Sequence, residues 1–170
     1  MMEGQLSELP YGIMNKSEVV KNIIDGKIVA IFQGDSEWGP RALGNRSILF
    51  DPRNPNAKDI VNKVKRREWY RPFAGTILLE YVNDYFEMLT IKESPYMSYA
   101  IPAKQKAKDE VPGIIHVDGT CRIQTVTREQ NKHYYDLIEE FYKQTGVPIL
   151  FNTSFNLAGE PLVETLEDAK

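Results

Sequence analysis

The order of apolar and polar residues along the chain predicts helices and strands in turn. Residues 18–25 carry Val and Ile at helical spacing, with Ser17 as the capping residue and Gly26 as the stop. The nearly continuous apolar run at 27–33 is typical of a buried strand. The longest helical pattern covers 132–145 and stops at a glycine. We therefore expect an α/β protein.

Shorter patterns complete this prediction. Residues 57–66 are expected to form a helix that buries Ile60, Val61 and Val64, whereas the polar stretch 104–110 is expected to be a mobile loop. Strands are expected at 48–50, 76–79, 97–101, 114–117, 122–126 and 147–151, and a short helix at 82–88. Loops that follow strand ends are common ligand-binding places in α/β proteins.

Composition narrows the class of protein. The chain has 170 residues, 42% of them apolar and 26% charged, which suits one globular domain with a real core. Its formal net charge of -3 argues against a dedicated nucleic-acid binder. The segment from Arg41 to Arg71, however, holds nine Lys and Arg against three Asp and Glu. Such a segment fits either a local pocket for an anionic ligand or a solvated basic helix.

Cysteine and histidine are scarce. Cys121 is the only cysteine, which excludes a disulfide framework and a multi-cysteine metal site and fits a reducing cytoplasm. The two histidines, His116 and His133, are interpreted as packing and solvated, so we expect no metal site. We expect no signal peptide and no membrane span. A capped helix start at Thr165, close to the last residue, indicates a truncated C-terminal end.

Basic and polar side chains gather at several predicted strand ends. Arginine offers a planar donor fork for carboxylate or phosphate oxygens, and glycine lets backbone approach a ligand closely. The candidates are Arg41, Arg46, Lys65, Arg67, Arg71, Arg122, Asn152, Ser154 and Asn156. Together they favour a site for a phosphorylated ligand, although no Walker-type loop or dinucleotide fingerprint is present. The alternative is that each arginine pairs with an acidic residue at the surface.

Four long motifs carry a resemblance. They are GDSEWGPRALGNRSILFDPRNP, KVKRREWYRPFAG, HVDGTCRIQTV and GVPILFNTSFNLAGEPLV. From about residue 18 onward the chain resembles the C-terminal domain of the O-carbamoyltransferases of the nodulation-protein and cephamycin type, the NodU/CmcH group. That domain is YrdC-like, and YrdC-like proteins carry Lys-x-Arg and Ser-x-Asn at their nucleotide site. Lys65-Arg66-Arg67 and Ser154-Phe155-Asn156 match both patterns.

The resemblance implies a fold and a division of the chain. The expected fold is α/β and YrdC-like, with a twisted mixed sheet flanked by helices. Residues 1–16 would be a lead-in or linker. Residues 17–170 would be the carbamoyltransferase C-terminal domain, truncated at its C-terminal end.

The resemblance also implies a function. The domain would bind ATP, with Mg²⁺, and carbamoyl phosphate, and would form carbamoyl-adenylate. A separate N-terminal domain of the actin-like ATPase superfamily would then pass the carbamoyl group to a hydroxyl acceptor, so complete transfer by this chain alone is not expected. The implied catalytic residues are Lys65, Arg71 and Arg122, and the implied cofactor-binding residues are Arg41, Arg67, Asn152, Ser154 and Asn156.

Three alternatives remain open at the level of sequence. One is a threonylcarbamoyl-adenylate synthase-like enzyme that uses bicarbonate and threonine. Another is a non-catalytic nucleotide-binding or interaction module. A third is RNA binding through the basic segment, which would show a steep dependence on salt.

Overall fold

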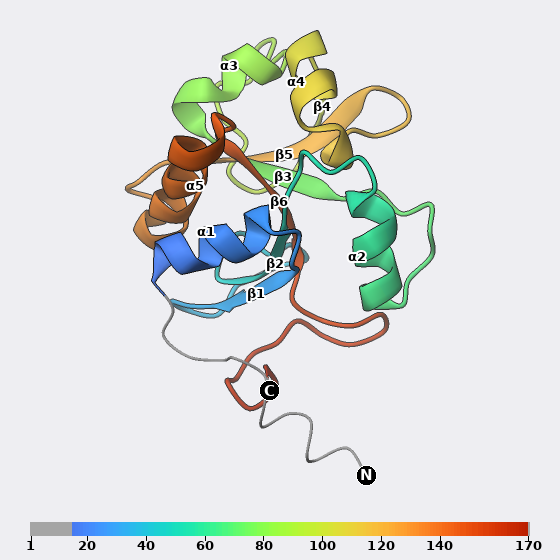
Figure 1. Cartoon of the computed structure of the whole chain (residues 1–170), viewed down its shortest axis with the longest axis vertical. Helices are drawn as coiled ribbons and strands as arrows, with labels where there is room; N and C mark the ends of the chain where they lie inside the picture. Colours follow the sequence, from blue (N-terminus) through green and yellow to red (C-terminus); the bar gives the residue numbers. More distant parts are fainter. Residues whose placement is uncertain (1–14, 170) are drawn as a thin grey trace.

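The computed structural model describes residues 15–169, in which helices flank a six-stranded mixed sheet (Figure 1). The strands are β1 (Val29–Phe32), β2 (Arg46–Phe50), β3 (Ala74–Leu78), β4 (Ala100–Pro102), β5 (Thr120–Val126) and β6 (Ile149–Ser154). The α-helices are α1 (Lys16–Ile24), α2 (Ala57–Lys65), α3 (Val82–Tyr85), α4 (Gln105–Glu110) and α5 (Lys132–Thr145). Two 3₁₀ helices, η2 (Leu79–Tyr81) and η3 (Pro112–Ile114), complete the described elements. The expected α/β class, with a mixed sheet flanked by helices, is confirmed.

The strand order brings distant segments together. The sheet runs β1-β2-β6-β3-β5-β4, with β3 and β5 parallel and every other neighbouring pair antiparallel. In this register Ala74 of β3 lies opposite both Arg122 of β5 and Asn152 of β6. Because paired residues project to the same face of a sheet, Arg122 and Asn152 flank the small Ala74 on one face.

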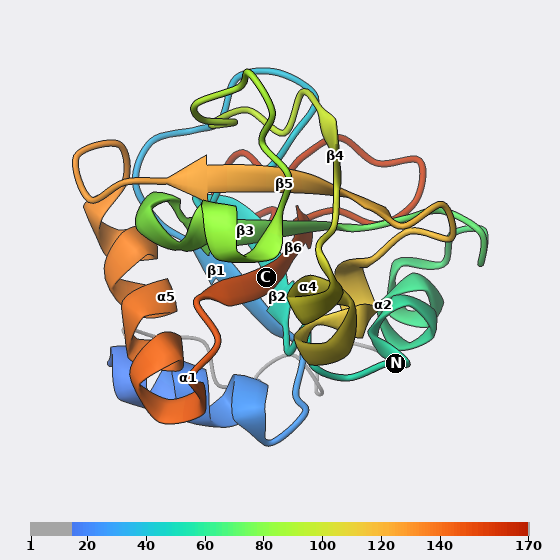
Figure 2. The same ribbon diagram turned by 90° about the horizontal axis from the view of Figure 1, so that it is seen from above.

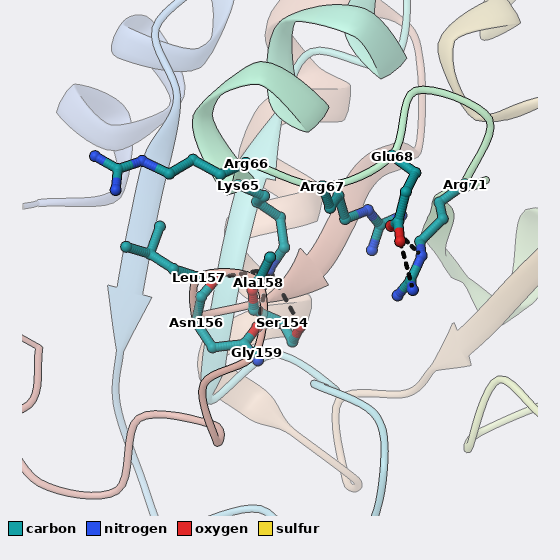
Figure 3. A pocket seen from close by; sticks show the side chains of 10 residues that line it. All are labelled: Lys65, Arg66, Arg67, Glu68, Arg71, Ser154, Asn156, Leu157, Ala158 and Gly159. Atoms are coloured by element: carbon teal, nitrogen blue, oxygen red, sulfur yellow. Dashed lines mark hydrogen bonds and ion pairs between the residues drawn. The ribbon is translucent and has the colours of Figure 1, made fainter.

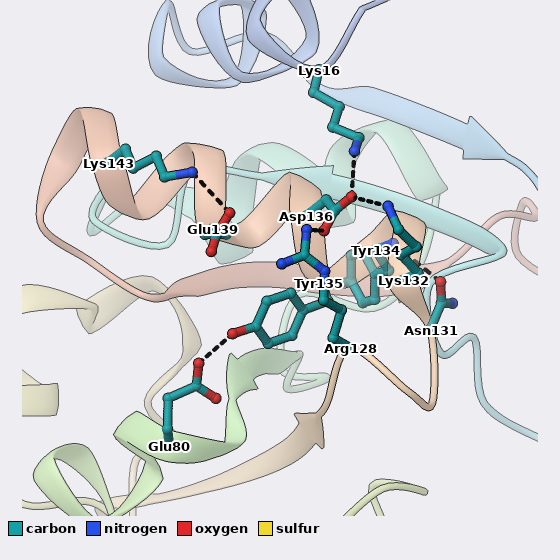
Figure 4. A network of polar contacts seen from close by, with 10 residues as sticks. All are labelled: Lys16, Glu80, Arg128, Asn131, Lys132, Tyr134, Tyr135, Asp136, Glu139 and Lys143. Atoms are coloured by element: carbon teal, nitrogen blue, oxygen red, sulfur yellow. Dashed lines mark hydrogen bonds and ion pairs between the residues drawn. The ribbon is translucent and has the colours of Figure 1, made fainter.

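The helices enclose an apolar core on both sides of the molecule. Helices α1 and α5 pack together, and α2 lies on the opposite side in both views (Figures 1 and 2). The carboxylate of Asp136 on α5 ties this helix pair together. It forms ion pairs with Lys16 at 2.6 Å, Arg128 at 2.6 Å and Lys132 at 2.9 Å (Figure 4). None of the helices in the described range 15–169 is long and apolar enough to cross a membrane.

Two expectations about the N-terminal half, the cap of α1 and the burial of β1, are wrong. The cap of α1 is Asn15, whose side chain accepts from the Glu18 amide at 2.8 Å, and not Ser17. The helix thus begins at Lys16, inside the segment assigned to the lead-in, while residues 1–14 lie outside the described residues. The apolar run at 27–33 forms β1, an edge strand with half-buried residues, because nothing pairs with its outer side among the described strands.

The buried face of α2 also differs from the prediction. Ile60 and Val64 are exposed, whereas Asn62 and Lys65 are buried at 3% and 2% exposure. Val61 is buried as expected. The helix turns its polar residues inward because carbonyl groups from distant segments supply their hydrogen-bond partners.

Two short segments take a different secondary structure. Residues 104–110 were expected to be a mobile loop, but Gln105–Glu110 form α4, which buries Ala107. Residues 114–117 were expected to be a strand, but the chain there leaves η3 and turns into β5. The tight turn at 116–120 leaves Val117 fully exposed, which a strand in the sheet interior would not.

Candidate functional site

A basic cavity of about 590 Å³ lies where α2 ends and the segment after β6 begins (Figure 3). Two stretches that are far apart in the sequence form its walls. The lining residues are Lys65, Arg66, Arg67, Glu68, Arg71, Ser154, Asn156, Leu157, Ala158 and Gly159. Five of the nine candidates named from the sequence therefore share one cavity: Lys65, Arg67, Arg71, Ser154 and Asn156.

The end of α2 distributes the basic side chains. Arg66 has a left-handed backbone conformation with φ of 52°, which ends the helix and reverses the chain. As a result Lys65 points down toward Ser154 and Asn156, and Arg66 points away from the other basic residues (Figure 3). Arg67 lies on the side of Arg71, so the two guanidinium groups face the same part of the cavity.

Lys65 forms the floor of this cavity. Its ammonium donates to the carbonyl of Ser154, and to the carbonyl and Oδ1 of Asn156, both at 2.9 Å. The Ser154 hydroxyl lies 3.3 Å away. Burial, and then the positive charge of Arg67, lower the pKa of Lys65 to about 8.

Arg67 is held by three neighbours. Its Nε donates to Oδ1 of Asn62 at 2.7 Å, and its Nη2 donates to the carbonyl of Pro72 at 2.8 Å. Its guanidinium lies 4.1 Å from the centre of the Phe73 ring. Burial and the nearby charges of Arg71 and Arg122 lower the pKa of Arg67. The positive charges around Arg67 thus outweigh the negative ones.

Glu68 is the only carboxylate among the lining residues. It pairs with Arg71 at 2.7 Å, and both side chains are about half exposed. An exposed ion pair of this kind contributes little stability. An anionic ligand can therefore replace Glu68 as the partner of Arg71 at a small cost in free energy. The cavity thus keeps a net excess of positive charge.

Arg122 and Arg41 lie beside the cavity and do not line it. Arg122 is half-buried on β5, and its side chain forms no hydrogen bond or ion pair with any described residue. Burial and then the charge of Arg41 lower the pKa of Arg122. Among the residues that the structure describes, the Arg41 side chain donates only to the neighbouring carbonyl of Pro40, at 3.0 Å. These two guanidinium groups therefore extend the positive charge from Arg67 along the sheet.

Asn152 holds the loop that carries Arg41. It is 1% exposed, and its Nδ2 donates to the carbonyl of Ala42 and to the Thr76 hydroxyl, both at 3.1 Å. Gln124 supports the same loop by donating to the carbonyl of Leu43 at 3.0 Å. Asn152 therefore positions the loop from below, and its own Oδ1 is buried without a partner among the described residues.

Sequence reasoning missed the residues that hold the basic side chains. Asn62 and Phe73 support Arg67, and Glu37 organises the Arg41 loop by accepting from the amides of Leu43 at 2.7 Å and Asn45 at 2.9 Å. A polar residue on the apolar side of α2 was the available signal for Asn62. No sequence pattern marks Glu37, because its partners are backbone amides.

His116 links two of these segments. Its Nε2 lies 2.9 Å from the carbonyl of Phe73, which can only accept, so this nitrogen carries the proton. Its Nδ1 lies 3.2 Å from the Thr120 hydroxyl. His116 thus fixes the start of β3 beside Arg67. No group of three or more potential metal-ligating residues occurs within the described residues.

Comparisons with known proteins agree on one family. The nodulation protein NolNO of Sinorhizobium fredii is 48% identical over 155 residues, covering 90% of this chain and 23% of that protein. NolO of Bradyrhizobium diazoefficiens is 46% identical over 147 residues, covering 85% of this chain and 27% of that protein. The chain thus spans about a quarter of the length of the curated relatives that it matches.

A solved structure shares the fold. The crystal structure of full-length HypF in the phosphate- and nucleotide-bound form is similar at a TM-score of 0.65 and 22% identity. The match covers 92% of this chain and 23% of that one. The family model for the carbamoyltransferase C-terminus matches residues 20–170. The resemblance noted in the sequence is confirmed, and the chain belongs to the carbamoyltransferase C-terminal family.

Proposed function

We propose that this chain binds ATP and carbamoyl phosphate and forms carbamoyl-adenylate, which a separate N-terminal domain uses to carbamoylate a hydroxyl acceptor. One observation carries the proposal. Four basic residues line one cavity against a single carboxylate, and three of them were predicted from the sequence: Lys65, Arg67 and Arg71. A site that binds a polyanion needs such fixed and unneutralised charge.

The charges are arranged before any ligand arrives. Burial, and then neighbouring positive charges, lower the pKa of Lys65, Arg67 and Arg122, so part of each shift comes from repulsion between these groups. A bound phosphate chain relieves this repulsion, so the ligand gains more from the cluster than from isolated surface arginines. Catalysis by such a site consists of positioning and electrostatic stabilisation, without a covalent enzyme intermediate.

The comparisons support this choice of ligand. The matched family is described as a carbamoyltransferase C-terminus, and the structural neighbour HypF was crystallised with phosphate and nucleotide. On this proposal Arg67 and Arg71 hold phosphates in the cavity. Arg122 and Arg41 extend the site toward the sheet, and Ser154 and Asn156 orient the nucleotide or the carbamoyl group.

Magnesium would enter with the nucleotide. Mg²⁺ keeps several waters and is commonly held by substrate phosphates and one or two carboxylates. Glu68, as the carboxylate of the cavity, fits the second role, since its partner Arg71 would then be free for phosphate. The ion would neutralise phosphate charge and leave the positioning to the basic residues.

The proposed reaction balances as two steps. Water cleaves carbamoyl phosphate to carbamate and inorganic phosphate. A carbamate oxygen then attacks the α-phosphorus of ATP, forms the new P–O bond and expels pyrophosphate. The guanidinium groups stabilise negative charge that builds on the phosphoryl oxygens.

Pyrophosphate release tests the proposal. With this chain and Mg²⁺, pyrophosphate should form from ATP only when carbamoyl phosphate is present. Release that instead requires bicarbonate and threonine would assign the chain to the threonylcarbamoyl-adenylate synthases. ATP binding without release in either mixture would assign it to a non-catalytic module.

The division of labour has its own assay. Isotope-labelled carbamoyl phosphate, ATP and a panel of hydroxyl compounds are incubated with the chain, with and without the N-terminal part of a relative. Transfer should require that part. Efficient transfer by the 170-residue chain alone would refute the proposed division.

A further inference from the structure

The ammonium of Lys65 has no donor left for a ligand. An ammonium carries three N–H groups. The carbonyls of Ser154 and Asn156 and the Oδ1 of Asn156 accept them, and the Ser154 hydroxyl lies in reach as a fourth oxygen. A direct bond from Lys65 to a phosphate would therefore require one of these bonds to break.

The same bonds shape the wall segment, residues 154–160. The Ser154 hydroxyl donates to Asn156 Oδ1 at 2.6 Å, and Asn156 Nδ2 donates to the carbonyl of Glu160 at 2.7 Å. The backbone amide of Ala158 donates to the carbonyl of Lys65 at 3.0 Å. Lys65 thus sits at the centre of a folded segment whose residues form one side of the cavity (Figure 3).

We propose that Lys65 is a positioning residue. Its ammonium folds the wall segment, and the wall segment in turn closes the cavity in which Arg67 and Arg71 meet the anionic ligand. This inference deepens the proposed function and rests on it for the identity of the ligand. The folding of the wall segment by Lys65 is independent of any ligand.

The environment of Lys65 supports this role. The side chain is 2% exposed, and no carboxylate within residues 15–169 pairs with it. Its charged neighbour is Arg67, which repels it. A buried charge without a counterion persists only where oriented oxygens replace water, and the oxygens of Ser154 and Asn156 do so here. The lysine and the wall segment therefore stabilise each other.

Amide hydrogen exchange of the ligand-free chain tests the inference. In Lys65→Met, which keeps the buried volume but removes the donors, peptides from 154–160 should exchange about tenfold faster, as expected when about 1.4 kcal/mol of charge-assisted hydrogen bonding is lost. Lys63→Met is the matched control, because Lys63 is exposed on the same helix. It should leave the exchange of this segment unchanged.

A second variant separates loss of the wall from loss of the fold. Asn156→Ala removes an acceptor and leaves Lys65 in place, and it should also accelerate exchange in 154–160. The double variant should show less than the product of the two single effects, because both changes break one network. Peptides from α5 report on the global fold and should keep their protection in all variants.

The outcomes are distinguishable. Unchanged exchange of 154–160 in Lys65→Met, together with lost ATP binding, would overturn the inference and assign Lys65 to direct ligand contact. Faster exchange of 154–160 in the variants, together with a wild-type chain that binds no ATP, would support the role of Lys65 and overturn the proposed function.

Discussion

Asn62 accepts a 2.7 Å hydrogen bond from Nε of Arg67. Asn62 is buried within α2, and Arg67 lies beyond the end of that helix. The same amide donates to the carbonyl of Trp69 at 3.2 Å and that of Arg71 at 3.4 Å. One side chain thus fixes both the arginine fork and the turn that carries it. The shape of the cavity depends on this residue although Asn62 does not line it.

Asn62→Ala should therefore weaken both stability and binding. We expect the free energy of unfolding to fall by about 1–3 kcal/mol, because Arg67 and the carbonyls of Trp69 and Arg71 lose their partner, and ATP affinity to fall with it. Urea denaturation and calorimetry measure the two effects. Lys63→Ala, one residue along and exposed, should change neither. Equal behaviour of the two variants would contradict the role of Asn62.

Arg67→Gln should weaken ATP binding by about 1–3 kcal/mol, the scale of a hydrogen bond to a charged group. Arg66→Gln is the matched control, because the Arg66 side chain points away from Arg67 and Arg71 (Figure 3). It removes the same charge from the neighbouring position and should cost much less. Titration calorimetry at fixed ionic strength compares them, and equal losses would mean that only overall charge matters.

The lowered pKa of Lys65 predicts that the stability of the chain rises with pH. Burial and Arg67 lower its pKa from 10.5 to about 8 in the folded chain. Between these values the unfolded chain binds a proton that the folded chain has lost, so the free energy of unfolding should increase over this window. ATP affinity should fall through pH 8, because the cavity loses a positive charge.

Comparison with Lys65→Met isolates this effect. Burial raises the pKa of the Cys121 thiol from 9.0 to about 12, so its ionisation in the unfolded chain lowers stability at high pH. Both chains contain Cys121, and its contribution cancels in their difference. Urea denaturation from pH 7 to about pH 10 should show wild type gaining on the variant. A difference that stays flat would refute the lowered pKa.

The lowered pKa of Asp136 predicts how the stability of the chain changes in acid. Burial raises its pKa, but hydrogen bonds from Lys16 and Lys132, and the charges of Lys16 and Arg128, outweigh this and lower the pKa from 3.8 to about 2 (Figure 4). The stability that these contacts provide is fully present above pH 3.8 and should be lost as the pH falls through 2.

Asp136→Asn should destabilise the chain at neutral pH by about 1–3 kcal/mol and should remove this acid-sensitive component. The ion pair between Asp136 and Lys16 joins α5 to α1. It lies away from the residues that line the cavity, so ATP affinity should stay unchanged. Asp59→Asn, an exposed change on α2, is the control. Thermal unfolding between pH 2 and pH 6 compares the three chains.

The strands of the sheet and the longest helix, α5, could be predicted because their sequence signals are local. Helix α5 begins at Lys132 and ends at Gly146, whose left-handed φ of 75° only glycine adopts without strain. The apolar residues of its helical pattern include Leu137, Ile138 and Phe141, which are buried. Such signals need no knowledge of the rest of the fold.

The failures have a common physical cause. Asn62 and Lys65 are buried because their partners come from residues 69–71 and 154–156, which no local pattern places beside α2. The helix at 105–110 forms although its sequence is polar, since burial of Ala107 against the core decides its conformation. Position in the sheet likewise makes the apolar β1 an edge strand.

The candidate site was predicted only in part, again because some contacts come from residues that are distant in the sequence. Clusters of basic residues mark Lys65, Arg67 and Arg71, and the cavity contains them. Asn152 lies two residues before Ser154 on the same face of β6, but the Arg41 loop covers it through the carbonyl of Ala42. Whether a polar residue after a strand faces a cavity or supports a loop depends on the register, which the sequence alone did not provide.

The two-part construction of the cavity has a consequence for a chain emerging from the ribosome. Residues 65–71 are synthesised long before residues 154–159, which supply the other wall, and before Asn152, which holds the Arg41 loop. Contacts so distant in sequence close late, after the loop between them has been ordered. The nascent chain therefore carries its basic segment without a formed cavity, and the cavity is complete only once β6 has joined the sheet.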